Sequence, residues 1–303
     1  MKQWLLNLKP KCKIILDLLP KIFAYVEITR PLNLLLAILS IFLGALVSGT
    51  IHPITKVFFA CISGSFIMAG GNVLNDFFDF EIDRINKPNR VLPSGKMSPA
   101  QALFWAFFLF VAGLNLSLLI HWQAFGIAVL AVFLLILYAW QFKKTVLWGN
   151  ILVSALSALA FFYGGLAVGK SEAALIPALF ALLFHLGREI IKDLEDQPGD
   201  QAQGLRTLPI QYGTRVALLW VTLIFGLLIL LTFLPYGLHI YGKAYLWTVL
   251  PGVDLVLLIV IFILWLRPKP HIFNRLAFIL KYDMFLGLLA IFLGNYEKVD
   301  LIF

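Results

Sequence analysis

The sequence predicts an all-helical polytopic membrane protein with nine transmembrane helices, and three observations support this fold class. The 303 residues are 61% hydrophobic and only 13% charged, which is far more apolar than a soluble domain. Apolar windows of about 20 residues, enough to cross a bilayer as a helix, recur from residue 31 to near the C-terminus. These windows lack the alternation of a membrane β-barrel, and a helix satisfies its own backbone polar groups in lipid.

The predicted spans follow from windowed hydropathy. They cover residues 31–51, 55–75, 99–120, 122–141, 147–168, 172–192, 214–234, 245–266 and 274–294. We therefore expect one transmembrane domain over residues 31–294 and a short tail over residues 295–303. Residues 1–30 mix lysine with tryptophan, leucine, isoleucine and phenylalanine. That composition favours helices lying on an anionic membrane surface over the alternative, an unstructured basic tail.

Basic residues are distributed unevenly between the two sides of the membrane. All but four of the 24 lysines and arginines lie in the N-terminal segment or near the connections from an even-numbered span to the next span. The exceptions are Lys56, Lys170, Lys243 and Lys298. By the positive-inside rule, the N-terminus and these connections are expected on the cytoplasmic side, and the C-terminus on the opposite side. The net charge of +8 follows from this bias, so it indicates no nucleic-acid partner.

More than half of the 16 acidic residues fall in two clusters. The clusters are Asp76, Asp79, Glu81 and Asp83 after the second span, and Glu189, Asp193, Glu195, Asp196 and Asp200 at the end of the sixth. Four spans separate them, so both are expected on the cytoplasmic side. Asn75, Asp79 and Asp83 share one helical face at a spacing of four residues, and Asp196 and Asp200 repeat that spacing.

Carboxylates grouped in this way repel one another unless a cation lies among them. Oxygen ligands of this kind suit Mg²⁺, which binds one or two carboxylates together with substrate phosphates. The same side also carries basic residues, namely Arg84, Arg90, Lys143, Lys144 and Arg206. Metal-loaded carboxylates facing these cations predict a site for a diphosphate. The alternative is that the acids are solvated and paired with neighbouring lysines and arginines.

At these residues the chain resembles the UbiA superfamily of intramembrane prenyltransferases. The family's NDxxDxxxD signature is matched by Asn75, Asp76, Asp79 and Asp83, its DxxxD signature by Asp196 and Asp200, and its Tyr and Lys motif by Tyr138, Lys143 and Lys144 in "YAWQFKK". The strings "NDFFDFEIDRINKPNRVLPSG" and "REIIKDLEDQPGD" look most like the members that are digeranylgeranylglyceryl phosphate synthases. Members that prenylate aromatic acceptors for quinone or chlorophyll-type pathways share the acidic motifs and are the alternative.

The resemblance implies a central cavity under a cytoplasmic cap and a Mg²⁺-dependent transfer of an isoprenyl group from its diphosphate to a lipophilic acceptor. For the closest-looking members this is geranylgeranyl transfer to geranylgeranylglyceryl phosphate in ether-lipid synthesis. It implies two Mg²⁺ ions held by Asn75, Asp79, Asp83, Asp196 and Asp200. It implies substrate contacts from Asn33, Asn72, Arg84, Arg90, Lys143, Lys144 and Arg206. It implies catalytic roles for Asp76, Tyr138, Lys143 and Asp193. No protein partner is implied.

For Tyr138 the implied role is shielding of a carbocation by the ring face, and the alternative is an ordinary membrane-interface tyrosine. For Asn33 the alternative is helix capping or packing.

A divalent-cation transporter is the competing function of another class, because rings of aspartate also collect cations at a pore mouth. It predicts polar residues through several spans, whereas Asp254 and His185 are the main interruptions here. For Asp254 we expect a structural hydrogen bond. A lipid phosphatase with a histidine nucleophile is disfavoured, because the histidines are scattered along the chain.

Overall fold

The computed structural model describes the backbone of residues 10–296 and the side chains of residues 19–296. The predicted N-terminal segment (residues 1–30) and C-terminal tail (residues 295–303) therefore lie partly outside the described residues. The described chain contains helices and no strand. The helices are α2 (Pro10–Glu27), α3 (Pro31–Val47), α4 (Ile54–Phe78), α5 (Phe80–Asn86), α6 (Pro99–Leu118), α7 (Trp122–Trp140), η1 (Phe142–Lys144), α8 (Trp148–Ala167), η2 (Glu172–Ala174), α9 (Leu175–Ala202), α10 (Leu208–Tyr212), α11 (Thr214–Thr232), α12 (Leu234–Gly237), α13 (Lys243–Val249), η3 (Leu250–Asp254), α14 (Leu255–Leu266) and α15 (Pro270–Asn295).

The all-helical membrane fold is confirmed. In the described part of the chain, eight helical segments are long and apolar enough to cross a membrane. A ninth is formed if Leu19–Glu27 and Pro31–Val47, which meet at a bend of 49°, are taken as one broken span. Each predicted span coincides with one of these segments.

The sixth span differs from its predicted end. Hydropathy ends it at residue 192, whereas α9 continues to Ala202 with Pro198 inside the helix. The extension is acidic, so a hydropathy window cannot detect it. The extension packs against α5, the short helix that follows α4, and this contact supports its helical conformation. The second acidic motif, which is Asp196 and Asp200, therefore lies on the end of a transmembrane helix rather than on a loop.

The first acidic motif crosses a break between two helices. α4 ends at Phe78 and α5 begins at Phe80, with Asp79 between them. The backbone N–H of Asp79 still donates to the carbonyl of Asn75 at 2.9 Å, and that of Asp83 donates to the carbonyl of Asp79 at 2.7 Å. Helical register therefore continues through the break, which keeps these three side chains on one face.

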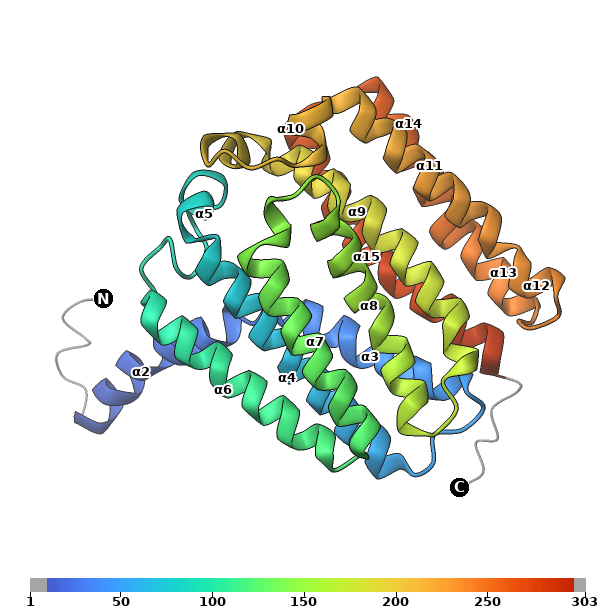
Figure 1. Ribbon diagram of the computed structural model, residues 1–303, viewed down its shortest axis with the longest axis horizontal. Helices are drawn as coiled ribbons and strands as arrows, with labels where there is room; N and C mark the ends of the chain where they lie inside the picture. The colour runs from blue at the N-terminus through green and yellow to red at the C-terminus, as the bar shows by residue number, and fades with distance from the viewer. Residues whose placement is uncertain (1–9, 297–303) are drawn as a thin grey trace.

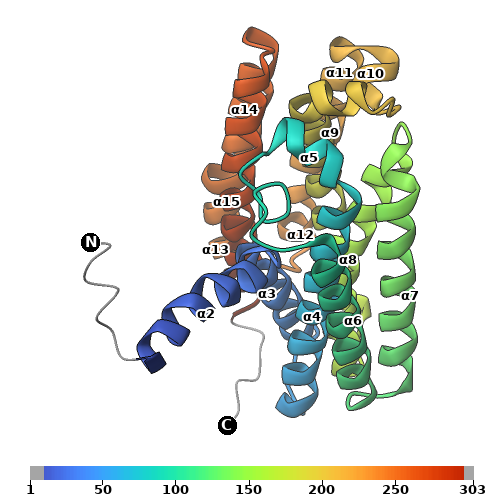
Figure 2. The same cartoon turned by 90° about the vertical axis from the view of Figure 1, so that its left-hand side faces the viewer.

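Six helices form a closed ring in which each helix packs against the next: α3, α4, α7, α8, α9 and α15, with α15 returning to α3. α6 covers the outside of the ring against α4 and α7, and α11 and α13 pack against α9 and α15. Figures 1 and 2 show the short helices α5 and α10 together at one end of the bundle. That end carries both acidic motifs and corresponds to the predicted cap.

α3 also crosses α8, which lies opposite it in the ring, and the two backbones approach closely there. A Cβ atom on Gly164 of α8 would lie 1.8 Å from the carbonyl oxygen of Ile41. A Cβ atom on Gly44 of α3 would lie 1.9 Å from the carbonyl oxygen of Phe161. The two backbones therefore touch through a reciprocal pair of glycines, as small residues allow between membrane helices.

The described part of the N-terminal segment is helical and projects from the bundle (Figure 2). Its last turns are attached by Lys96, which donates to Glu27 at 2.8 Å, and by Trp105, whose indole N–H donates to the carbonyl of Tyr25 at 3.3 Å. Four apolar side chains remain exposed: Leu19, Ile22, Phe23 and Val26. Exposed apolar residues beside lysine suit a helix at a membrane surface.

Candidate active site

A cavity of about 390 Å³ is lined by residues of the six ring helices and also of α5, α11 and α13. It is polar at α5 and the end of α9, and its lining on α11, α13 and α15 is mostly apolar but includes Lys281 and Asp283. The structure brings most of the predicted site residues to its wall. Those that line it are Asn33, Asn72, Asn75, Asp79, Asp83, Arg90, Tyr138, Lys143, Asp193, Asp196 and Asp200.

Four predicted site residues do not line the cavity. Arg84 is exposed and pairs with Glu81 at 3.2 Å, because it follows Asp83 and so points to another side of α5. Lys144 and Arg206 are exposed, and the two segments meet where the Arg206 N–H donates to the Lys144 carbonyl at 3.3 Å. The fourth residue, Asp76, is buried behind the cavity wall.

Asp76 joins two cavity-lining cations. It pairs with Arg30, which stands at the bend between α2 and α3 with a φ of 57°, and with Arg90 at 3.3 Å. Asn72 supports the same bend, since its side-chain amide donates to the carbonyl of Thr29 at 2.9 Å. Arg30 was counted from the sequence only as a topology determinant. Its position just before Pro31 and Asn33 is the one sequence signal for its role.

The acidic motifs are paired with cations across the cavity. Lys143 of η1 pairs with Asp79. Arg90 pairs with Asp83 at 2.6 Å, and Lys87 pairs with Asp196 at 2.7 Å. The sequence did not predict the role of Lys87, whose ion pair with Asp196 links the segment after the first motif to the second motif. Each pair places a lysine or arginine at the cavity wall beside a carboxylate.

The two motifs are also held together by Asn86, another residue that sequence reasoning missed. Its side-chain N–H donates to the carbonyl of Asp196 at 3.0 Å, and its side-chain oxygen accepts from the Gly199 N–H at 3.0 Å. A Cβ atom on Gly199 would lie 2.4 Å from the Asn86 side-chain nitrogen. The sequence signal was the Pro198–Gly199 pair, which is unusual within a helix.

Burial and pairing act in opposite directions on these groups. Burial tends to raise the pKa of Asp79, but Lys143, followed by Arg90 and Arg30, outweighs it and holds that pKa below its ordinary value. Burial also raises the pKa of Asp83, and there Arg90 does not compensate fully. Burial tends to lower the pKa of Lys143, yet Asp79 raises it overall. The Asp79–Lys143 pair is therefore ionic at neutral pH.

The side-chain oxygen atoms at the end of the cavity that carries the acidic motifs are the type of ligand that a hard divalent cation prefers. Asn75 donates from its side-chain nitrogen to Asp79 at 2.7 Å, which leaves its side-chain oxygen buried and without a hydrogen-bond partner. Among the described residues no three acidic, histidine or cysteine side chains converge in a metal-binding arrangement. The carboxylates instead face lysine and arginine. The oxygen-only donor set and the unpartnered Asn75 oxygen suit Mg²⁺.

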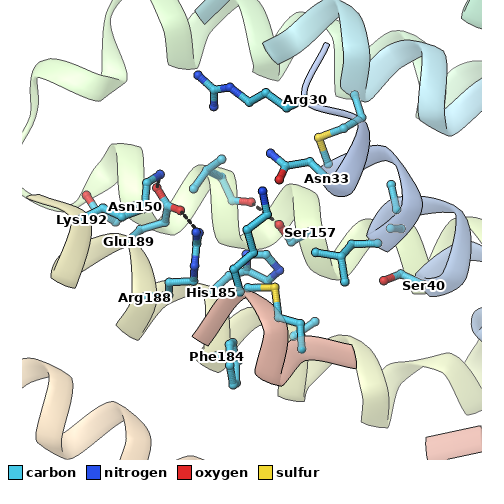
Figure 3. Close-up of a pocket in the computed structure, with 18 of the residues that line it drawn as sticks. Arg30, Asn33, Ser40, Asn150, Ser157, Phe184, His185, Arg188, Glu189 and Lys192 are labelled. Atoms are coloured by element: carbon cyan, nitrogen blue, oxygen red, sulfur yellow. Dashed lines mark hydrogen bonds and ion pairs between the residues drawn. The ribbon is translucent and has the colours of Figure 1, made fainter. Parts of the chain in front are cut away.

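Other polar groups lie beyond the acidic end. Asp193 accepts a hydrogen bond from the Asn150 side chain at 2.8 Å. Figure 3 shows Asn150 together with Glu189, Arg188 and His185 around the cavity. Asp254 accepts from the hydroxyl of Thr232 at 3.0 Å, the kind of structural bond expected for it. A cavity that has charged residues at one end and mostly apolar residues between membrane helices can hold an amphipathic molecule with a charged head and a long hydrocarbon chain.

Comparison with known proteins identifies the family. The sequence profile of the UbiA prenyltransferase family matches residues 36–289. The digeranylgeranylglyceryl phosphate synthase of Thermococcus gammatolerans is 40% identical over 269 residues, covering 88% of this chain and 96% of that protein. The same-named protein of Methanopyrus kandleri is 40% identical over 271 residues, covering 88% and 97%.

Solved structures agree in fold. A structure of digeranylgeranylglyceryl phosphate synthase is 36% identical, with a TM-score of 0.72, and the match covers 91% of this chain and 99% of that one. A UbiA homolog from Archaeoglobus fulgidus bound to GPP and Mg²⁺ is 21% identical, with a TM-score of 0.66 and coverage of 88% and 99%, and supports the fold alone. The chain therefore belongs to the UbiA prenyltransferase family.

Proposed function

We propose that this prenyltransferase transfers a geranylgeranyl group from its diphosphate to geranylgeranylglyceryl phosphate, in a Mg²⁺-dependent reaction that forms an ether bond. Relatives at about 40% identity carry the name of the synthase that performs this step. The observation that carries the proposal is one cavity that joins two acidic motifs and their cations to a mostly apolar end between membrane helices. The family is one of prenyltransferases, so the transporter alternative is set aside.

Asn75, Asp79 and Asp83 from α4–α5, together with Asp196 and Asp200 from α9, are the proposed ligands of two Mg²⁺ ions. All five line the polar end of the cavity. Bound Mg²⁺ would neutralise the oxygens of the diphosphate and so make it a better leaving group. The register that continues from Asn75 through Asp83 keeps the first ligand set on one face.

Lys143, Arg90 and Lys87 are the proposed diphosphate contacts. Each is held beside a carboxylate at the cavity wall. The diphosphate of the donor can replace that carboxylate as the anionic partner, and the cations are then already in position. Arg84, Lys144 and Arg206 are left out of this role, because they do not line the cavity. Asp76 acts as a positioning residue through Arg30 and Arg90.

The bond between the allylic carbon and the diphosphate oxygen breaks, and a bond from that carbon to the acceptor hydroxyl oxygen forms. Developing positive charge needs a site that excludes water. Tyr138 lines the cavity and offers its ring face to that charge. Asp193, held by Asn150, is the proposed acceptor of the hydroxyl proton. Diphosphate leaves toward the cap, and the excess of basic residues at that end supports a cytoplasmic position for it.

The test is incubation of the purified protein with Mg²⁺ and labelled geranylgeranyl diphosphate, offered geranylgeranylglyceryl phosphate or 4-hydroxybenzoate in parallel. The expected product is the doubly geranylgeranylated glyceryl phosphate, and EDTA should prevent its formation. Transfer to the aromatic acid alone would refute the proposed acceptor and support the aromatic alternative.

A further inference from the structure

A second group of charged residues lies in the same cavity, beyond the acidic motifs. Arg188 and Lys192 of α9 and Lys281 of α15 all line the cavity, and Glu189 is the carboxylate among them. We call Arg188, Lys192 and Lys281 the cationic cluster. None of the three belongs to the acidic motifs or to the cations paired with them.

The cationic cluster has more positive charge than its carboxylate can balance. Glu189 is shared, with Lys192 at 2.7 Å and Arg188 at 3.3 Å. Arg188 also donates from Nε to the carbonyl of Ala277 at 3.2 Å, which fixes its guanidinium against α15. Three cations and one carboxylate leave a formal excess of two positive charges.

Lys281 is the residue that most needs an explanation. In the described part of the chain it has no hydrogen bond and no ion pair, and the charged groups acting on it are Arg188, Arg30 and Lys192, all cations. It lies well inside α15, which runs from Pro270 to Asn295. An ionisable side chain within a membrane span is costly and usually marks a place for a ligand or ion.

The surroundings suit an anion. Figure 3 shows Arg30, Asn33, His185 and Arg188 around one part of the cavity, together with Glu189. Apart from the acidic motifs, two further carboxylates of the described residues line the same cavity. Asp193 is hydrogen-bonded to Asn150, and Asp283 has Asp254 as its charged neighbour rather than a residue of the cationic cluster. Because the excess is on lysine and arginine, an anion can bind here directly, without a metal. This differs from the acidic motifs, which need a metal before they can hold a phosphate.

The two sites follow one another along α9. Arg188 and Lys192 precede Asp196 and Asp200 at a helical spacing of four residues, and all four line the cavity. Arg188 and Asp196 are eight positions apart, or roughly 12 Å along the axis at about 1.5 Å per residue. A molecule between them could present one phosphate to the cations while its reacting group faces the donor at the acidic end.

We propose that the cationic cluster binds the phosphate of the acceptor lipid, without a metal, and so selects a phosphorylated acceptor over a neutral or aromatic one. The inference rests on the proposed function and extends it by assigning the residues that recognise the acceptor phosphate. A phosphate monoester carries a charge of about −1.5 to −2 at neutral pH, which matches the excess of the cluster. An aromatic carboxylate would balance only half of it.

The first experiment compares Lys281→Met with Arg275→Met, since Arg275 is on the same helix, is exposed and does not line the cavity. In Lys281→Met the KM for geranylgeranylglyceryl phosphate should rise about 10- to 100-fold, the effect of losing a charge-assisted hydrogen bond. The KM for geranylgeranyl diphosphate should change by less than about twofold. Arg275→Met should match wild type, and Lys281→Arg should retain most of the acceptor affinity.

A neutral acceptor tests the phosphate directly. Wild type should use geranylgeranylglycerol, which lacks the phosphate, much less efficiently than the phosphorylated acceptor. Lys281→Met should lose that preference without using the neutral lipid less well. A merely structural role for Lys281 would instead change the KM of the donor and of both acceptors together. Lys281→Gln is a second neutral variant in case Lys281→Met does not fold.

The second experiment measures binding in EDTA, where the acidic motifs hold no metal. Geranylgeranylglyceryl phosphate should raise the Tm of wild type and Arg275→Met but not that of Lys281→Met, and inorganic phosphate at the same concentration should raise none. An equal rise with inorganic phosphate, or an unchanged acceptor KM in Lys281→Met, overturns the inference while the proposed function stands. A wild type that cannot prenylate geranylgeranylglyceryl phosphate overturns both.

Discussion

Asn86 and Gly199 are joined by a hydrogen bond of 3.0 Å, from the backbone N–H of Gly199 to the side-chain oxygen of Asn86. The same side chain donates to the carbonyl of Asp196 at 3.0 Å. One asparagine thereby fixes the end of α5, which carries Asp83, against the turn of α9 that carries Asp196 and Asp200. The spacing of the two acidic motifs depends on this contact between segments far apart in the sequence.

Asn86→Ala should therefore weaken catalysis without unfolding the protein. It removes two hydrogen bonds worth about 1 kcal/mol each, and misplacement of one motif against the other should lower kcat/KM for the donor roughly tenfold or more. Gly199→Ala should act in the same direction, because its Cβ would meet Asn86. Asn89→Ala, at an exposed position of the following loop, is the control. Wild-type kinetics in both variants would show that the contact does not set the spacing.

Removing the charge of one acid from either motif should reduce turnover severely. Asp79→Asn and Asp196→Asn keep the side-chain shape but weaken the proposed metal ligands, and each should lower kcat/KM by at least about 100-fold. The Mg²⁺ concentration needed for half-maximal rate should rise in whatever activity remains. Glu81→Gln is the matched control, since Glu81 lies between the motif acids but is exposed and, within the described residues, pairs only with Arg84. Near-normal rates in both aspartate variants would refute the two-motif metal site.

The Asp79–Lys143 pair predicts a pH-dependent difference in stability. The pKa of Asp79 is lowered by folding despite its burial, so its contribution is present above its unfolded pKa of about 4 and is lost as pH falls through the folded value. The pKa of Lys143 is raised, so its contribution is present below about 10.4 and is lost as pH rises through the folded value. The pair thus stabilises the protein between these limits.

Lys143→Met should accordingly lower the Tm in EDTA at pH 7, because it leaves the buried Asp79 carboxylate unpaired at a cost of about 3 kcal/mol. The Tm difference from wild type should shrink as the pH is lowered toward about 4, where the variant's Asp79 is protonated. Lys144→Met, at the exposed neighbouring position, should show no such dependence. A Tm difference that stays constant from pH 7 to pH 4.5 would contradict the electrostatic explanation.

Hydropathy and spacing could predict the spans and the shared face of the acidic motifs, because both are local properties of the chain. The spacing of four also separates Asn75, Asp79 and Asp83 from Asp76, which lies about 100° around the helix and proves to face Arg30 instead of the cavity. The same rule would have excluded Arg84. Asp76 was assigned through the family motif, which names letters but not their directions, whereas Arg84 was assigned because it follows the first acidic cluster on the same side of the membrane.

The contacts of Asn86 and Lys87 with Asp196 could not be predicted in this way. These residues are separated by 110 and 109 positions, and no periodicity links segments so far apart. The end of α9 was missed for a related reason. Its acidic turns are held by contact with α5, whereas a hydropathy window measures only the apolar part of a helix.

The glycine crossing of α3 and α8 gives the last prediction. A Cβ atom at Gly164 would overlap the carbonyl of Ile41, which is backbone and cannot move aside without shifting the helix. Gly164→Ala should therefore lower the Tm, at a cost of about 1–3 kcal/mol for overpacking. Gly126→Ala is the matched control, since Gly126 lies within α7 and no other described segment comes within 4 Å of its Cβ position. It should be neutral or stabilising by up to about 1 kcal/mol.

Gly44→Ala should be destabilising like Gly164→Ala, because it meets the carbonyl of Phe161 at the same crossing. Once one alanine has pushed α3 and α8 apart, the second finds part of its space already open. The two Tm decreases should therefore sum to more than the decrease in the double variant, as expected for residues that share one contact. Full additivity would show that the two glycines act independently. A Gly164→Ala variant as stable as Gly126→Ala would contradict the close approach of α3 and α8.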